Sequence, residues 1–134
     1  MIKTPIQIRF SDCDMLQHVN NAIYLQYFET SRINFFKTEL PNWDWKEKGI
    51  IMLKNEVEYK IPLFLTDDCF VEISCLHIGT KSFTFFYEVK VNSPKGIITK
   101  SIGKSVMVCF NFNTNQTINL PHNLKLSLQK YLIK

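Results

Sequence analysis

Hydrophobic and polar residues alternate with a period of two in five segments of the chain, the pattern of β-strands that each bury one face. The hydrophobic positions on which this prediction rests are Ile6, Ile8 and Phe10; Ile51, Leu53, Val57, Tyr59 and Ile61; Cys69, Val71, Ile73 and Cys75; Phe83, Phe85, Tyr87, Val89 and Val91; and Ile102, Val106, Val108, Phe110 and Phe112. Short links containing Gly or Pro, at 78–81 and 92–96, predict that the last three strands form an antiparallel meander.

Residues 20–38 lack this alternation and contain no Gly or Pro. Their hydrophobic residues follow a helical period and form a broad, mostly aromatic stripe, which predicts a long helix buried against the sheet. The stripe consists of Ile23, Tyr24, Tyr27, Phe28, Ser31 and Phe35. We expect Asn20 or Asn21 to cap the helix and Pro41 to end it. A second helical pattern predicts a short helix within residues 121–134.

The predicted order is one strand, one long helix and four further strands, an α+β arrangement in which a helix covers one face of a curved five-stranded sheet. With 134 residues, of which 46% are hydrophobic and 21% charged, the chain is predicted to fold as a single domain over 1–134 and not to be disordered. So short a chain has little left to enclose a large substrate, and we expect a second copy to supply the remaining wall.

The formal net charge of +4 is compatible with an anionic ligand, but the lysines are scattered, so no nucleic-acid partner is predicted. The four cysteines form no CxxC pair and no cluster with histidine, and we expect no metal site. Without an 18-residue apolar run or the apolar core of a signal peptide, we expect no membrane span and a cytoplasmic protein.

Polar residues concentrate in Ser11–Asn21, between the first predicted strand and the long helix. Unpaired amide groups at the start of a helix favour developing negative charge, and a nearby carboxylate can activate water. This composition fits a catalytic loop, but such a composition is common in loops, and on spacing alone a polar loop that caps the helix is the better interpretation.

The segments RFSDCD (9–14), HVNNAIY (18–24) and YFETSR (27–32) resemble the opening of hot-dog-fold thioesterases, most closely the 4-hydroxybenzoyl-CoA thioesterase-like group. The resemblance continues through 59–63, 67–68, Gly79, 81–83 and Gly96, and thus spans nearly the whole chain. The D-x-D pair followed by HVNN and a tyrosine is its most specific part.

The resemblance implies a hot-dog fold, in which a curved antiparallel five-stranded sheet wraps around one long central helix, here with a short C-terminal helix added. It implies an acyl-CoA thioesterase that converts a thioester and water to a carboxylic acid and free CoA. No cofactor is expected, since coenzyme A belongs to the substrate. The implied assembly is a homodimer or homotetramer with the active site at the subunit interface.

The resemblance assigns the catalytic carboxylate to Asp14, as the nucleophile or as the base for water. It assigns the oxyanion donor to the backbone N–H of Asn21. Asp12 is then interpreted as a residue that orders the loop, and His18 is a further catalytic candidate. We do not assign Cys13 as a nucleophile, because two neighbouring aspartates disfavour its thiolate.

Glu29 is the rival carboxylate, since a second branch of these thioesterases places the catalytic acid on the helix. Its spacing to Arg32 is that of an ordinary i,i+3 ion pair, which we take as the better interpretation. The remaining substrate-binding candidates lie at strand and loop ends or on the helix, where they could contact coenzyme A or line the pocket. They are Asn20, Tyr24, Lys60, Lys81 and Ser82, with Lys104 as a further cation.

Other functions remain open at this point. The substrate could be a carrier-protein thioester, or the chain could be a non-catalytic acyl-CoA-binding subunit. Enoyl thioester hydratases of the same fold place Asp and His five positions apart with a Pro between them. Asp14 and His18 are four apart with no Pro, which argues against hydration.

Overall fold

The computed structural model describes residues 1–133. Its elements follow the predicted order, with one short 3₁₀ turn (η1) and one two-residue strand (β6) added. They are β1 (Ile2–Ile6), η1 (Phe10–Asp12), α1 (Ile23–Glu39), β2 (Gly49–Tyr59), β3 (Asp68–Ile78), β4 (Ser82–Ser93), β5 (Gly96–Asn111), β6 (Gln116–Thr117) and α2 (His122–Lys130).

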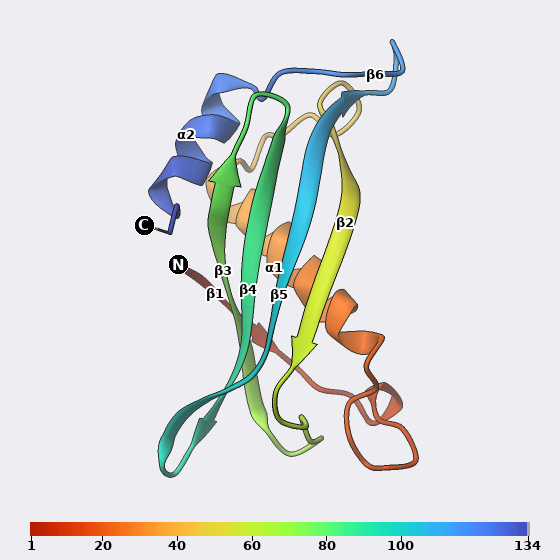
Figure 1. The fold of residues 1–134 in the computed structure, drawn as a ribbon, viewed down its shortest axis with the longest axis vertical. Helices are drawn as coiled ribbons and strands as arrows, with labels where there is room; N and C mark the ends of the chain where they lie inside the picture. The colour runs from red at the N-terminus through yellow and green to blue at the C-terminus, as the bar shows by residue number, and fades with distance from the viewer. Residues whose placement is uncertain (134) are drawn as a thin grey trace.

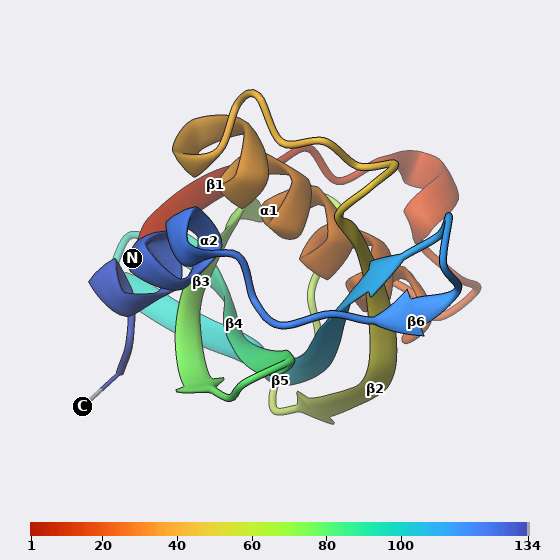
Figure 2. The ribbon, with the colours of Figure 1, turned by 90° about the horizontal axis from the view of Figure 1, so that it is seen from above.

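The strands form one antiparallel sheet in the order β1-β3-β4-β5-β2, and β6 pairs with the end of β5. The predicted meander of β3, β4 and β5 is confirmed. Figure 1 shows α1 crossing behind the strands, and the view from above shows the sheet curving around it, with α2 beside β3 (Figure 2). The predicted hot-dog fold and the short C-terminal helix are therefore confirmed.

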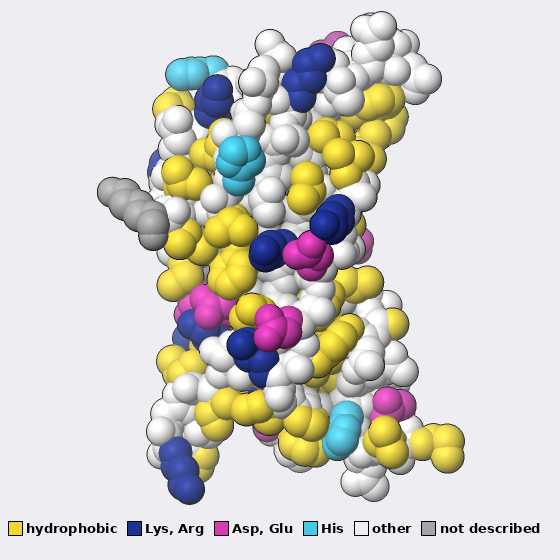
Figure 3. Space-filling view, viewed as in Figure 1, with side chains coloured by type: hydrophobic (Ala, Val, Ile, Leu, Met, Phe, Trp, Pro, Cys, Tyr) yellow, Lys and Arg dark blue, Asp and Glu magenta, His cyan; other side chains and the backbone are white. Residues whose placement is uncertain are grey.

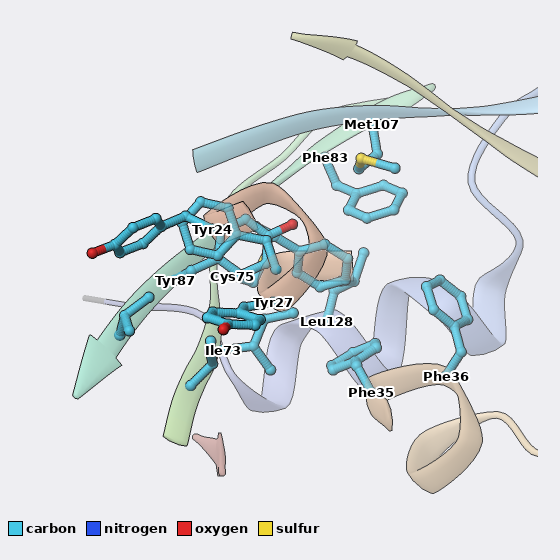
Figure 4. Close-up of a cluster of buried hydrophobic side chains, with 14 of the residues drawn as sticks. Tyr24, Tyr27, Phe35, Phe36, Ile73, Cys75, Phe83, Tyr87, Met107 and Leu128 are labelled. Carbon is cyan, nitrogen blue, oxygen red and sulfur yellow. The ribbon is translucent and has the colours of Figure 1, made fainter. Parts of the chain in front are cut away.

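An aromatic core joins α1 to the concave face of the sheet (Figure 4). Phe28 of α1 stacks on Tyr87 of β4, with ring centroids 4.4 Å apart and planes only 7° from parallel. Further along the helix, Phe35 meets Phe85 edge to face at 5.1 Å. The predicted stripe is buried as expected, apart from the half-buried Ile23, and Phe36 extends it. The helix therefore forms because one wide apolar face is covered by the sheet.

The predicted buried face of β5 is wrong. Its inward side carries small or slender residues, Ser101, Gly103, Ser105, Met107 and Cys109, while the predicted Ile102, Val106, Val108 and Phe110 point to the outer side, where Val108 alone of the four is buried. The helix explains the choice, since the Phe28 ring lies so close to Gly103 that an added Cβ would be 2.5 Å from it. The large side chains of β5 would not fit beneath α1.

Two edge strands also differ from the prediction. β1 ends at Ile6, and the chain then turns so that Phe10 lies in η1 with 84% of its surface exposed. In β2 an irregularity between Met52 and Lys54 leaves Leu53 64% exposed. Strands at a sheet edge are irregular more often than central ones, and a prediction from the alternation of hydrophobic residues does not detect such a bulge.

The ends of α1 are close to those predicted. The helix ends at Glu39, shortly before Pro41. At its start, the Asn20 side chain does not cap the first helical turn; its Oδ1 instead accepts the N–H of Ala22 at 2.9 Å, just before the helix begins. Asn20 therefore shapes the approach to the helix.

The outer face of the sheet is covered by ion pairs set among hydrophobic side chains (Figure 3). Lys90 lies 2.9 Å from Glu72, and Lys54 and Lys104 lie 2.8 and 3.7 Å from Glu56. No helix within residues 1–133 is both long and apolar enough to cross a membrane.

Substituting Gly103→Ala should lower the free energy of unfolding by about 1–3 kcal/mol, because the new methyl group would press on the buried Phe28 ring. Urea denaturation measures this loss as a reduced midpoint. The double variant Gly103→Ala/Phe28→Leu should lose less than the sum of the two single variants, since the smaller side chain makes room. Strict additivity would contradict the close approach.

Candidate active site

The loop between β1 and α1 is anchored from below by Asp12. This buried carboxylate accepts the phenolic O–H of Tyr27 at 2.7 Å and the backbone N–H of Arg9 at 3.0 Å. Its backbone carbonyl accepts the N–H of Asn20 at 2.8 Å, which ties the far end of the loop to the same point. Asp12 thus orders the loop in the structure, in agreement with its interpretation from the sequence.

Asp14 lies on the exposed side of this loop, two residues beyond the anchor. Its Oδ1 accepts the N–H of Leu16 at 2.9 Å, and its backbone N–H donates to the carbonyl of His18. Oδ2 accepts no hydrogen bond from the residues that the structure describes. The Asp14 carboxylate is therefore oriented through one oxygen, and the other is available to a ligand.

Asp14 lines a surface cavity of about 430 Å³. Most of the surrounding surface comes from carbon-rich side chains of two separate segments, 10–17 and 64–66. The lining residues are Phe10, Cys13, Asp14, Gln17, Phe64, Leu65 and Thr66. A carboxylate on the wall of a mostly apolar hollow is a feature typical of sites that bind small molecules.

A second cavity, of about 200 Å³, gathers several of the other predicted site residues. It is lined by His18, Val19, Asn21, Tyr24, Tyr59, Lys60, Ile61 and Pro62. The Tyr59 hydroxyl donates to the carbonyl of Asn21 at 2.7 Å, and its ring meets that of Tyr24 edge to face at 5.0 Å. The end of β2 is thereby fixed to the start of α1.

The two cavities flank the contact between His18 and Phe64, whose rings meet edge to face at 5.1 Å. The backbones of these residues also form an isolated β-bridge. Asp14 and Asn21, the two residues predicted to act together, therefore line two different cavities that the His18–Phe64 contact joins.

Burial raises the pKa values of the two tyrosines beneath the loop. It raises the pKa of Tyr24 to about 12. Burial, together with the hydrogen bond to Asp12, also raises the pKa of Tyr27. Both phenols are thus neutral at physiological pH, and Tyr27 acts as a hydrogen-bond donor. The pKa of the Cys13 thiol is raised by burial and by Asp12 and Asp14, which disfavours a nucleophilic thiolate.

Glu29 lies apart from both cavities. It is on the exposed side of α1, 3.9 Å from Arg32, in the predicted i,i+3 ion pair. Arg32 also donates to the Tyr87 hydroxyl at 3.1 Å, so it is tied to the core. The predicted ion pair is therefore present, and the role of Glu29 stays a prediction.

The predicted binding residues do not all meet within one chain. Lys60 lines the second cavity, and Asn20 lies in the adjoining turn. Lys81 and Ser82 are at the β3–β4 hairpin, at the opposite end of the sheet from the loop (Figure 1). Ser101 pairs with both Val89 of β4 and Tyr59 of β2, so these residues lie at the same level of the sheet. Ser82 is seven residues along β4 from Val89. At about 3.3 Å per residue, Ser82 is therefore roughly 23 Å along the sheet from the level of Tyr59. Lys104 is on the outer face, paired with Glu56.

Sequence reasoning missed the residues that Phe64, Leu65 and Thr66 contribute to the Asp14 cavity. They are about fifty positions away in the chain, and no spacing rule connects them to Asp14. One signal was present in the sequence: the hydrophobic run Leu63, Phe64 and Leu65 follows Pro62, where a connecting segment would be expected to be polar.

No group of three or more His, Cys, Asp and Glu side chains in the described part of the chain is arranged to hold a metal ion.

Residues 8–128 match the family model described as the thioesterase-like superfamily. The chain belongs to this superfamily. The match includes the whole of the loop, α1 and all the major strands of the sheet except β1.

The known proteins that this chain resembles are distant from it in sequence. Uncharacterized protein YsmA of Bacillus subtilis (strain 168) is 26% identical over 82 residues, 61% of this chain and 56% of YsmA, so less than two thirds of that relative is matched. The long-chain acyl-CoA thioesterase FadM of Escherichia coli (strain K12) is 20% identical over 132 residues, 96% of this chain and 98% of FadM. A thioesterase of Thermus thermophilus, solved with coenzyme A and Zn, has a TM-score of 0.82 and 28% identity, covering 96% of this chain and 92% of that one.

Removing the Tyr27 hydroxyl should destabilise this superfamily member. Tyr27→Phe leaves the buried Asp12 carboxylate without its side-chain donor, at a cost of about 1.5–3 kcal/mol in the free energy of unfolding. Chemical denaturation at pH 7 measures this cost. Tyr131→Phe is the matched control, because its hydroxyl meets Glu39 at 3.2 Å nearer the surface and should cost less. Equal losses in the two variants would argue against the anchoring role of Asp12.

Proposed function

We propose that this chain is an acyl-CoA thioesterase that hydrolyses the thioester of an acyl-CoA to a carboxylic acid and free CoA. The observation that carries the proposal is the Asp14 carboxylate, with one free oxygen among the described contacts, on the wall of an apolar cavity at the rim of the core. The superfamily membership and the similarity to FadM support the same activity. We treat 1–134 as one thioesterase domain that acts in the cytoplasm without a cofactor.

In the proposed reaction the apolar acyl group enters the cavity lined by Phe10, Phe64 and Leu65, which brings its carbonyl carbon to Asp14. The carboxylate either takes a proton from the attacking water or itself attacks the carbonyl carbon to give an anhydride that water then opens. In both routes a C–O bond forms and the C–S bond breaks. The sulfur leaves as the CoA thiolate and takes up a proton.

The proposed oxyanion donor is the backbone N–H of Asn21. Within residues 1–133 this N–H has no hydrogen-bond acceptor. The carbonyl of Asn20, part of the same peptide group, accepts the N–H of Ile23 at 2.9 Å, which holds the peptide plane in place. A donor fixed before the substrate arrives stabilises developing charge with little reorganisation. His18, between Asp14 and Asn21 in the chain and beside both cavities, is the second polar group within reach.

A second copy of the chain completes the proposed site. β2 is an edge strand, and antiparallel pairing of two β2 edges would bring the Gly49 end of one copy beside the Tyr59 end of the other. Because Ser82 and Lys81 lie at the Gly49 end of the sheet, this pairing would move them towards the other copy's Asn21 and Lys60. Coenzyme A would then be held by Lys60 and Asn20 of one copy and by Lys81 and Ser82 of its mate.

Release of free thiol from a panel of short, medium, long and aromatic acyl-CoAs tests this function. We expect turnover with apolar acyl groups, and we expect Asp14→Asn to lower kcat by at least about 100-fold, because the amide cannot act as base or nucleophile. Thermal denaturation checks that the variant is folded.

Two control variants separate the alternatives. Asp44→Asn is matched, since Asp44 is also an exposed aspartate whose Oδ1 accepts loop N–H groups, and it should leave kcat unchanged. Glu29→Gln should also be active; a loss there together with an active Asp14→Asn would transfer the catalytic role to the helix. Turnover of carrier-protein thioesters alone, or binding of acyl-CoA without thiol release, would replace the proposed substrate or activity.

The proposed edge pairing predicts that a monomer is inactive. If pairing is centred on Asn55, Lys54 of each copy lies opposite Glu56 of the other, and Glu56→Lys places like charges across the edge. Light scattering should then show a smaller particle and the thiol assay a loss of activity, with little change in melting temperature because Glu56 is exposed.

The charge-swapped variant Lys54→Glu/Glu56→Lys restores opposite charges across the same pairing and should recover both assembly and activity. An active monomer would overturn the shared site, and a Glu56→Lys assembly of unchanged mass would overturn the pairing centred on Asn55.

A further inference from the structure

One buried lysine contacts the segment 60–67 at several of its residues. Lys100 of β5 has only 8% of its side chain exposed, yet it lies beneath a surface segment that contributes to both cavities. Phe64, Leu65 and Thr66 line the Asp14 cavity, and Lys60, Ile61 and Pro62 line the second one. The contacts that hold this segment in place therefore also hold one wall of each cavity in place.

A β-bulge explains why Lys100 points towards this segment. In the pairing of β4 with β5, Val89 is opposite Ser101 and Lys90 is opposite Thr99, so Lys100 is the extra residue of β5. A bulge re-aims the side chain at its position and bends the strand. The carbonyl of Lys100 accepts the N–H groups of both Lys60 and Ile61 at 3.0 Å, directly after the end of β2.

The Lys100 side chain makes further contacts along the same segment. Its Nζ donates to the Pro62 carbonyl at 2.9 Å and lies 3.5 Å from Oδ2 of Asp67. That same Asp67 oxygen accepts the Phe64 N–H at 2.9 Å. The ammonium is also 5.3 Å from the centre of the Phe64 ring. A buried ammonium is costly unless it is paired in this way, so the segment and the lysine hold each other in place.

The segment 60–67 is in turn bonded to the loop that carries Asp14. The Val19 N–H donates to the Leu63 carbonyl at 2.8 Å, and His18 meets Phe64 through both backbone and ring. We infer that Lys100 is a positioning residue of the site: through the Pro62 carbonyl and Asp67 it sets the place of Phe64 and Leu65, and hence the width of the cavity at Asp14. The kinetic part of this inference rests on the proposed thioesterase function.

Amide hydrogen exchange on the full chain tests the inference without any substrate. In Lys100→Met the exchange of the Phe64 and Val19 amides should accelerate at least about 10-fold, while amides at the centre of β3 and β4 keep their rates. Lys100→Arg retains the charge and should recover most of the protection. Unchanged exchange at Phe64 and Val19 in a folded Lys100→Met variant would overturn the inference.

The matched control is Lys90→Met. Lys90 is likewise largely buried, with 17% of its side chain exposed, and pairs with Glu72 at 2.9 Å, but on the outer face of the sheet. The Lys90→Met variant should have a lower melting temperature, with no faster amide exchange at Phe64 or Val19. If Lys100→Met does not fold, Asp67→Asn replaces it, because it removes the ion pair and keeps an acceptor for the Phe64 N–H. It should loosen the same amides, and no change there would count against the inference.

Steady-state kinetics supply the second readout. Displacing the cavity wall should raise KM for the preferred acyl-CoA about 10-fold or more and flatten the preference among acyl groups, with a smaller fall in kcat because Asp14 is retained. A fall in kcat alone at unchanged KM would contradict the positioning of the wall. If the wild-type protein releases no thiol, the proposed function fails, and hydrogen exchange still decides whether Lys100 orders the segment.

Discussion

The stacking of Phe28 on Tyr87 is the contact on which the rest of the structure depends. It fixes how closely α1 approaches the sheet, and at 4.4 Å between ring centroids it leaves room only for a glycine at position 103. The same helix face carries Tyr24 and Tyr27 towards the start of the helix. Because a close-packed interior resists displacement, the position of the helix determines where these tyrosines meet the loop. The Asp12 anchor and the second cavity are therefore consequences of the core packing.

Two segments far apart in sequence, the loop after β1 and residues 60–67, together line the two cavities. In our proposal the loop after β1 contributes the reactive groups, the Asp14 carboxylate and the Asn21 amide, whereas 60–67 contributes mainly cavity wall. They meet at the His18–Phe64 pair and at the hydrogen bond from Val19 to Leu63. Each is supported by a buried ionisable side chain, Asp12 under the first and Lys100 under the second. Asp12 is held by hydrogen bonds and Lys100 by a hydrogen bond and an ion pair, and such buried polar contacts restrict the geometry of a surface loop.

The proposed second copy follows from the same geometry. One chain places Lys81 and Ser82 at the far end of the sheet from Asp14, so a single copy does not surround a molecule as large as an acyl-CoA. In our proposal, Lys81 and Ser82 therefore reach the Lys60 end of the site only when two copies of the chain pair. The charged, irregular β2 edge is where the structure leaves backbone groups open for such pairing.

The sequence by itself determined the order of elements, the buried helix, the β3–β4–β5 meander and the polar loop around Asp14, because local periodicity and turn residues encode them. It failed for β5, where the bulky residues suggested the wrong buried face, and for Phe10 and Leu53 near the sheet edges. Only the tertiary structure decided these points, since the depth of α1 selects small side chains opposite Phe28. It alone also brought Phe64 and Lys100 to the loop of Asp14, through a bulge and long-range contacts that no local pattern records.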